Sequence, residues 1–244
     1  MKKQYLSFDI EICNEMEEGN DDLTKFVPSV GAFCTDYETV SFYEDDPHMS
    51  KQTAQKLVFD MIKKAEEGYT LFGWNILSFD LQLLAHYSKM YAECGRLALN
   101  SVDGMFLVVA HKGFFLGLDK VLVGSNIETK LHQVTLNDGT TLFSMNGSKA
   151  PSLWRNKEFS AVKEYLKYDV FQPLKLAYHI DKTKFIKWTS NSGKPNTLRT
   201  EMLTVKEALN LPLPDTSWMT SPKAREDFYK WIPESVLKEE GVKQ

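Results

Sequence analysis

The sequence predicts an α/β protein, because strand-like and helix-like segments alternate along its first 180 residues. Residues 5–12 alternate in the manner of a strand, and residues 160–180 form a long amphipathic helical pattern. Between them, residues 51–66 carry apolar side chains at helical spacing and precede a short apolar run at 70–74. Of the 244 residues, 43% are hydrophobic and 25% are charged, a composition typical of folded globular chains.

The first strand carries two acidic residues on one face. Successive side chains of a strand point to opposite sides. One side therefore holds Leu6, Phe8, Ile10 and Ile12, and the other holds Tyr5, Ser7, Asp9 and Glu11. Further strand-like runs at 29–35 and 39–43 predict a three-stranded antiparallel meander.

A βα unit is expected to pack on this meander. The helix over 51–66 ends at Gly68, a suitable C-cap, and the run at 70–74 is predicted to be a buried strand. A helix is predicted over 79–91. Shorter helices at 104–112 and 118–123 and a hairpin at 131–145 follow, the hairpin turning at Asn137-Asp138-Gly139.

The last predicted helix of the main domain covers 160–180, and Pro173 should kink or divide it. We expect a main domain at 1–180 and an appended lobe at 181–244. The lobe contains a basic stretch and two short helices, one capped by Thr204 with Glu207 and one starting at Ser221-Pro222. Three tryptophans are expected to seal the lobe against the main domain: Trp154, Trp218 and Trp231.

Charge and cysteine content exclude several classes of protein. The net charge of −4 differs from the positive net charge that is typical of sequence-reading DNA-binding domains. It remains compatible with an enzyme that gathers carboxylates around cations. The spacing of Cys13, Cys34 and Cys94 suggests neither a disulfide framework nor a zinc site. No apolar run approaches the length of a membrane span, so we expect a cytoplasmic protein without a membrane partner.

Carboxylates occur in three settings that can converge on one site. Asp9 and Glu11 share a strand face, Asp80 follows a strand, and Asp169 lies on a helix one turn after Tyr165. Hydrolysis of a phosphodiester requires an activated water and a stabilised leaving oxygen, and two divalent ions can serve both ends. Such hard cations prefer carboxylate oxygens.

Three segments resemble the motifs of one nuclease family. Phe8-Asp-Ile-Glu11, Asn75-Ile-Leu-Ser-Phe-Asp80 and Tyr165-Leu-Lys-Tyr-Asp169 are similar, in order and form, to the exonuclease motifs of the DEDD superfamily. The Tyr-x-x-x-Asp form indicates the tyrosine (DEDDy) branch, and the set is most similar to the proofreading domain of B-family DNA polymerases. The resemblance spans about residues 9–170 and implies an RNase H-like fold, a mixed sheet with an antiparallel meander flanked by helices.

The resemblance also implies an activity and a role for each motif residue. Two Mg²⁺ or Mn²⁺ ions would be held by four acids: Asp9, Glu11, Asp80 and Asp169. Tyr165 would hold the attacking water, while Asn75 and Phe79 would shape their loop near the terminal nucleotide. The implied reaction is 3′→5′ exonuclease cleavage of single-stranded DNA more than RNA, releasing nucleoside 5′-monophosphates. A polymerase or another replication or repair protein would be a partner in trans.

Two other readings of the same chain remain open. One is a catalytically inactive module that binds nucleic acid on the same fold. The other is a scaffolding protein whose acidic loop at 15–22 and lobe at 181–244 bind a partner. The acidic loop lacks the alternating pattern of an EF-hand, so a solvated loop is the simpler interpretation.

Several residues outside the motifs have two interpretations each. The basic stretch carries Lys184, Lys187 and Trp188, which would either guide a substrate strand or belong to a solvated hairpin. Asp103 and Asp119 would either support the site from behind or cap helices. The remaining candidates, His111 and His132, are expected to be ordinary polar residues.

Overall fold

A mixed five-stranded sheet forms the centre of the computed structural model, which describes residues 3–15, 22–129 and 131–242. The strands are β1 (Gln4–Ile12), β2 (Pro28–Cys34), β3 (Ser41–Glu44), β4 (Tyr69–Gly73) and β5 (Val102–Asp103). Their order is β3-β2-β1-β4-β5; β1, β2 and β3 are antiparallel neighbours, whereas β4 is parallel to both β1 and β5. The predicted three-stranded meander is therefore confirmed.

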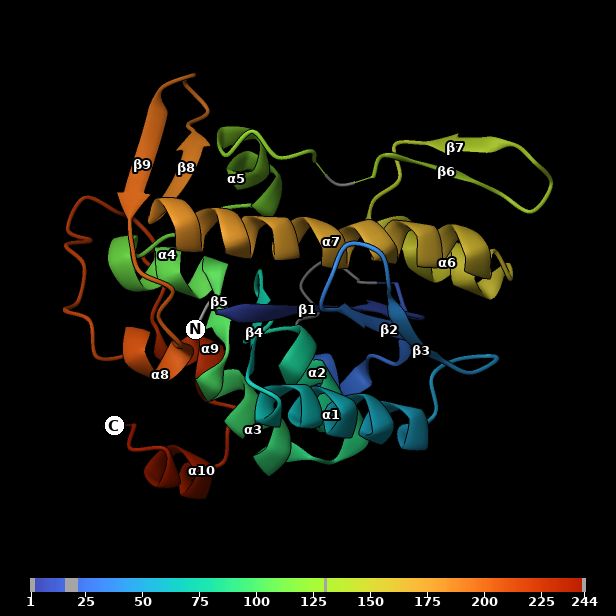
Figure 1. Ribbon diagram of the computed structural model, residues 1–244, viewed down its shortest axis with the longest axis horizontal. Coiled ribbons are helices and arrows are strands. Elements are labelled where there is room, and N and C mark those ends of the chain that lie inside the picture. The colour runs from blue at the N-terminus through green and yellow to red at the C-terminus, as the bar shows by residue number, and fades with distance from the viewer. Residues whose placement is uncertain (1–2, 16–21, 130, 243–244) are drawn as a thin grey trace.

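Helices cover both faces of the sheet (Figure 1). One long helix, α7 (Phe159–Thr183), lies across one face, and α1 (Lys51–Glu66) and α2 (Asp80–Ser88) lie on the other with α3 (Tyr91–Asn100) packed beside α2. Because both faces are covered, β1 is buried along most of its length, including Tyr5 and Ser7 on the face predicted to be the more polar one.

Shorter elements surround these layers. They are the 3₁₀ helices η1 (Leu23–Lys25) and η2 (Gly147–Lys149), the helices α4 (Gly104–Lys112), α5 (Leu118–Gly124), α6 (Ala150–Arg155), α8 (Val205–Ala208), α9 (Glu226–Tyr229) and α10 (Glu234–Glu239), and the hairpins β6 (Gln133–Thr135) with β7 (Thr141–Phe143) and β8 (Phe185–Thr189) with β9 (Pro195–Arg199). Most of the acidic loop predicted at 15–22 lies outside the described residues.

Three predicted elements differ from the structure. The helix predicted at 79–91 stops at Ser88, because Lys89 takes a left-handed conformation with φ 65°, and α3 then begins. Pro173 does not divide α7, which packs against three strands of the sheet along its length. The helix expected at Ser221-Pro222 is absent; α9 starts only at Glu226, after a segment held in irregular conformation by tertiary hydrogen bonds.

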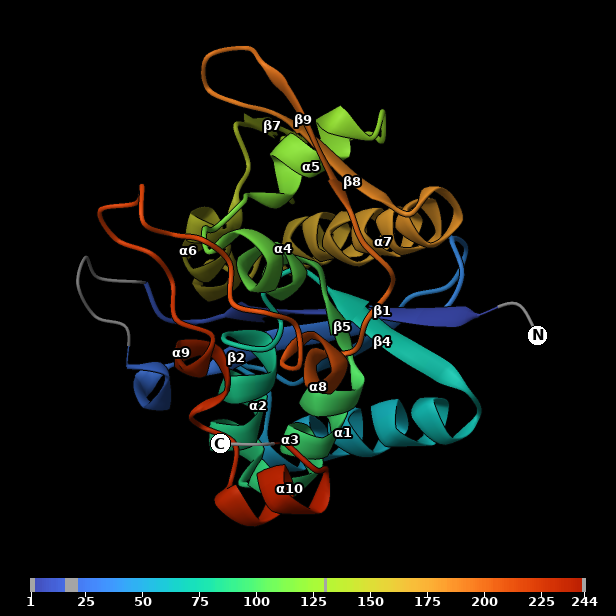
Figure 2. The ribbon, with the colours of Figure 1, turned by 90° about the vertical axis from the view of Figure 1, so that its left-hand side faces the viewer.

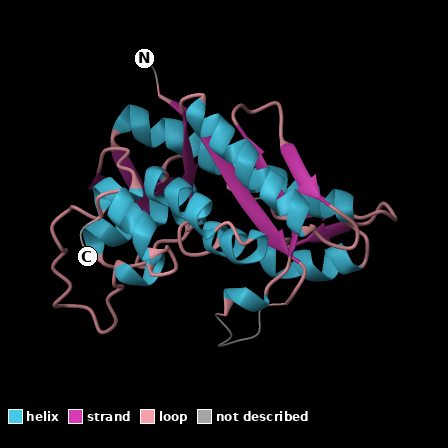
Figure 3. Ribbon diagram, turned by 90° about the horizontal axis from the view of Figure 1, so that it is seen from below, coloured by secondary structure: helices cyan, strands magenta, loops and turns pink. Residues whose placement is uncertain are grey.

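One buried arginine fixes this irregular segment between α8 and α9, which projects at the left of the molecule (Figure 1, Figure 3). Arg225 is only 6% exposed. Its guanidinium donates to the carbonyl oxygens of Leu211 at 2.6 Å, Pro212 at 2.7 Å and Ala110 at 2.6 Å. One side chain therefore joins the last turns of α4 to the C-terminal part of the chain. Whether residues 181–244 form a separate lobe stays a prediction.

Arg225→Ala should lower the free energy of unfolding by about 3 kcal/mol, because three carbonyl groups lose a charged donor and are left partly buried. The urea midpoint measures the change. Arg96 is a matched control, since its guanidinium is exposed and pairs with the exposed carboxylate of Glu239. Arg96→Ala should scarcely move the midpoint; equal effects in both variants would contradict the role given to Arg225.

No helix in the described part of the chain is both long and apolar enough to cross a membrane. The three cysteines are free thiols, and Cys34 and Cys94 are buried.

Candidate metal centre

The candidate site forms where β1 extends beyond its neighbour β4. The two strands pair only from Gln4 with Tyr69 to Ser7 with Phe72, and the chain leaves the sheet after Gly73. Further along β1, the backbone N–H of Ile10 donates to the Asp80 carboxylate at 3.2 Å. The Asp80 carboxylate thus accepts a backbone N–H group that β4 does not reach. This hydrogen bond places Asp80 against the part of β1 that carries Asp9 and Glu11.

Three carboxylates converge above this part of β1. Carboxylate oxygens of Asp9, Glu11 and Asp169 all lie within 4.8 Å of one another. Asp169 reaches the cluster because α7 packs directly on β1. Glu11 and Asp169 are buried and Asp9 is half-buried. Like charges this close repel one another, and an all-oxygen cluster of this kind has the donor chemistry that Mg²⁺ and Mn²⁺ prefer. The residues therefore fit a divalent cation.

Asp80 lies beside the cluster and contacts it through Asp9. Besides the bond from Ile10, a hydrogen bond links its carboxyl group to the Asp9 side chain. Burial raises the pKa of Asp80 to about 7, while these hydrogen bonds oppose the increase and the charge of Asp103 adds to it. Burial therefore favours the protonated form of Asp80.

Asp103 holds the loop that delivers Asp80. It is 1% exposed, and its carboxylate accepts from the backbone N–H groups of Asn75 at 3.0 Å and Leu77 at 2.9 Å. It also caps α4, accepting from Met105 at 2.9 Å and Phe106 at 3.0 Å. Both interpretations of Asp103 are therefore correct: one carboxylate supports the loop and starts a helix. Burial raises the pKa of Asp103, and the four donors oppose that increase.

The loop itself has a strained conformation at Asn75, whose φ of 71° lies in the left-handed region. The Ser78 hydroxyl donates to the Asn75 amide oxygen at 2.6 Å, and Phe79 is half-buried immediately before Asp80. Asn75 and Phe79 therefore lie in the segment that leads to Asp80, and a role for them at the terminal nucleotide stays a prediction. Asp80 opens α2, where a negative charge interacts favourably with the helix dipole.

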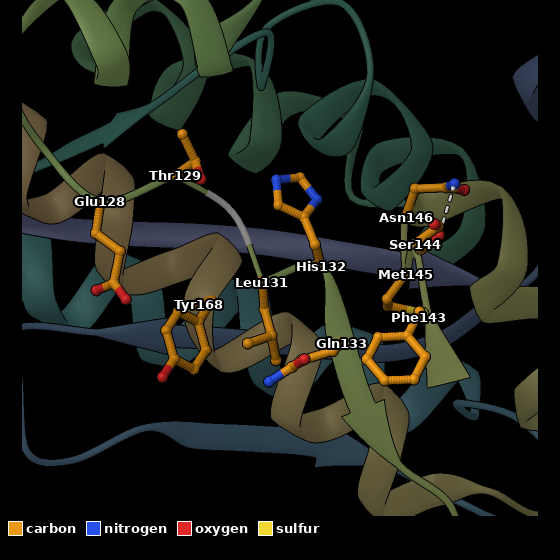
Figure 4. Close-up of a pocket in the computed structure, with 10 residues that line it drawn as sticks. All are labelled: Glu128, Thr129, Leu131, His132, Gln133, Phe143, Ser144, Met145, Asn146 and Tyr168. Carbon is orange, nitrogen blue, oxygen red and sulfur yellow. Dashed lines mark hydrogen bonds between the residues drawn. The ribbon is translucent and has the colours of Figure 1, made fainter. Parts of the chain in front are cut away.

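The two tyrosines of α7 point in different directions. Tyr165 is 3% exposed and lies one turn before Asp169, so both side chains share the helix face that covers β1. Tyr168 is half-buried and instead lines a pocket of about 690 Å³ between the β6–β7 hairpin and α7, opposite His132 and Phe143 (Figure 4). Only Tyr165 is placed on the side of the acids.

The predicted substrate residues after α7 lie well away from the carboxylates. Lys184 ends the helix, 15 residues after Asp169, which corresponds to about 22 Å along the axis. Its ammonium group pairs with Asp181 at 3.0 Å and Glu201 at 3.1 Å. Trp188 is 9% exposed and packs edge-on against Phe114, whereas Lys187 is exposed on β8. A role for Lys184, Lys187 and Trp188 in binding substrate stays a prediction.

Comparison with known proteins supports the fold. No family model and no curated protein matches the chain. Among solved structures, it is similar to the family B DNA polymerase from the hyperthermophilic archaeon Pyrobaculum calidifontis, with a TM-score of 0.54 and 20% sequence identity. The similarity covers 74% of this chain but 25% of the polymerase. The chain therefore shares its fold with about a quarter of that polymerase.

Proposed function

We propose that this protein is a metal-dependent 3′→5′ exonuclease that removes nucleotides from the 3′ end of single-stranded nucleic acid, DNA more than RNA. The convergence of Asp9, Glu11 and Asp169 from a strand and a helix carries the proposal. Two further findings support it: a mixed sheet with an antiparallel meander, as an RNase H-like fold requires, and similarity to part of a DNA polymerase. The 3′ ends would be presented by a polymerase or another replication or repair protein.

Each residue of the site has a proposed task. Asp9, Glu11, Asp80 and Asp169 would hold two Mg²⁺ or Mn²⁺ ions, with Asp9 shared between them. Bound there, the ions would promote deprotonation of a water and neutralise the leaving 3′ oxygen. The Tyr165 hydroxyl would orient that water for attack, one helical turn from Asp169. Phe79, at the end of the strained loop, would pack near the terminal nucleotide.

The activity is tested by incubating the protein with 3′- or 5′-labelled single-stranded DNA, duplex DNA and RNA, in Mg²⁺, Mn²⁺ or EDTA. We expect 5′-labelled single strands to shorten stepwise from the 3′ end in either metal and to stay intact in EDTA. Binding without shortening in either metal would contradict the enzyme and favour the inactive nucleic-acid-binding module. Equal ladders on DNA and RNA would remove the sugar preference from the proposal.

Tyr165→Phe should lower kcat by about 10²-fold with little change in KM, because it removes only the hydroxyl that orients the water. Tyr168→Phe is the matched control, since Tyr168 lies on the same helix but faces the β6–β7 pocket. It should retain the wild-type rate. If both variants lose activity equally, or neither does, Tyr165 has no role in holding the water.

A further inference from the structure

A second groove lies at the far end of α7, lined by the turn of the β8–β9 hairpin, the segment joining α4 to α5, and the loop that carries Trp218. Figure 2 shows the backbone of the hairpin beside α5. The volume of the groove is about 780 Å³. None of the residues that line it is acidic, whereas Lys112 and Lys120 contribute two positive charges. Ser190, Asn191 and Asn196 add uncharged polar groups. In a chain of net charge −4, this is a locally basic depression.

The groove is built on rigid contacts. The Lys120 ammonium group donates to the Asn191 side chain at 2.7 Å, which ties α5 to the hairpin turn. Gly124 lets α5 and β8 approach closely, since a Cβ there would lie 2.2 Å from the carbonyl oxygen of Lys187. The Trp74 indole donates to the carbonyl oxygen of Leu116, which lines the groove, at 2.8 Å. Trp74 immediately precedes Asn75, so the groove is connected to the loop that delivers Asp80.

Two aromatic rings in this groove are exposed to solvent. Phe115 is 49% exposed and Trp218 is 71% exposed. The Trp218 indole donates to the Asp215 carbonyl at 3.2 Å, and the ammonium group of Lys223 lies 4.7 Å from the centre of the Phe115 ring. Trp218 therefore does not seal the C-terminal region, contrary to the sequence-based prediction; Trp231 does, donating to the Leu77 carbonyl at 2.8 Å. Exposed rings beside lysines are suited to stack on unpaired bases while the lysines contact phosphates.

We propose that this groove binds single-stranded nucleic acid, and that it holds the strand several nucleotides upstream of the 3′ end. The first part rests on the groove alone, and the second rests on the proposed exonuclease function. Lys184, from which β8 leads to the groove, lies about 22 Å along α7 from Asp169, the length of about six nucleotides of a stacked strand at 3.4 Å each. A strand of about eight nucleotides or more would then reach both sites, and a tetranucleotide would not.

The test measures binding in EDTA, where no cleavage is expected, by the anisotropy of labelled oligothymidylates of 4 and 20 nucleotides. Phe115→Ala/Trp218→Ala should bind the 20-mer about 10-fold more weakly or worse, because it removes two stacking rings. Lys112→Ala/Lys120→Ala should reduce the slope of log affinity against log salt by about 1.4. Tryptophan fluorescence should be quenched by the 20-mer in the wild type and less in Trp218→Phe. The wild type should bind the 4-mer more weakly than the 20-mer, because only the longer strand reaches both sites.

Phe59→Ala and Lys51→Ala are matched controls on α1, where an exposed ring and an exposed lysine lie on the other side of the sheet. They should bind the 20-mer as the wild type does. Wild-type affinity and salt slope in the groove variants would overturn the proposal, as would equal affinity for duplex DNA, which offers no unstacked bases. Groove binding without metal-dependent cleavage would refute only the exonuclease; cleavage with unaffected groove variants would refute only the groove.

Discussion

Asp9→Asn is expected to reduce the rate of 3′-end hydrolysis by at least about 10³-fold, since a bound ion contributes several kcal/mol of transition-state stabilisation. The same substitution should stabilise the metal-free protein. Asp9 lies with Glu11 and Asp169 in a cluster of carboxylates within 4.8 Å, so loss of one negative charge relieves repulsion. We expect the melting temperature in EDTA to rise by about 3 °C, corresponding to about 1 kcal/mol.

Mg²⁺ should reverse the order of the melting temperatures, because it should stabilise the wild type and not Asp9→Asn. At 100 times its dissociation constant, a cation stabilises the native state by about 2.7 kcal/mol, or about 8 °C in the wild type, and this gain should be lost in Asp9→Asn. Glu164→Gln, which removes an exposed acid from α7, is the control and should behave as the wild type in rate and in both melts. An active Asp9→Asn, or one stabilised by Mg²⁺ as strongly as the wild type, would exclude Asp9 as a ligand.

Asp103→Ala is expected to lower the free energy of unfolding by about 4 kcal/mol. Its carboxylate is buried and accepts four backbone N–H groups, and alanine would leave those donors without an acceptor. The melting temperature should fall by about 10 °C. Because two of the donors belong to Asn75 and Leu77, activity should fall as well, even at temperatures where the variant is folded.

Asp103→Asn separates the two effects. The asparagine amide keeps one oxygen acceptor but directs its NH₂ group at backbone donors. The free energy of unfolding of Asp103→Asn should therefore lie between those of the wild type and Asp103→Ala, and the rate of hydrolysis should still fall. Asp119→Ala is the matched control, because Asp119 is an exposed acid in the first turn of α5. Its stability and rate should match the wild type. A stable, fully active Asp103→Ala would show that the Asn75–Asp80 loop keeps its shape without this carboxylate.

Local sequence pattern predicted those parts of the fold and site that depend on residues close together in the sequence. Two-residue alternation located β1 and put Asp9 and Glu11 on one face, and helical phase put Tyr165 and Asp169 on the buried side of α7. The alternation did not reveal that both faces of β1 are covered, because that depends on α7, which follows some 150 residues later.

The contacts that local pattern could not identify are made with partners that are distant in sequence. Asp103 acts on a loop 28 residues earlier, and Arg225 reaches a carbonyl 115 residues away. Neither leaves a periodic signal. Proline at a first-turn position suggested a helix at residue 222, but tertiary hydrogen bonds from Lys223 and Arg225 hold that segment irregular. The exposure of Trp218 likewise follows from the path of this loop rather than from the residue type.

The origin of the acids in distant elements determines when the site can exist. Asp169 is translated about 160 residues after Asp9 and reaches Asp9 and Glu11 only when α7 docks on β1. Contacts of such long sequence separation form late in folding. A nascent or truncated chain that ends before α7 therefore holds only part of the ligand set. Assembly of the complete set is therefore coupled to synthesis of the chain through α7.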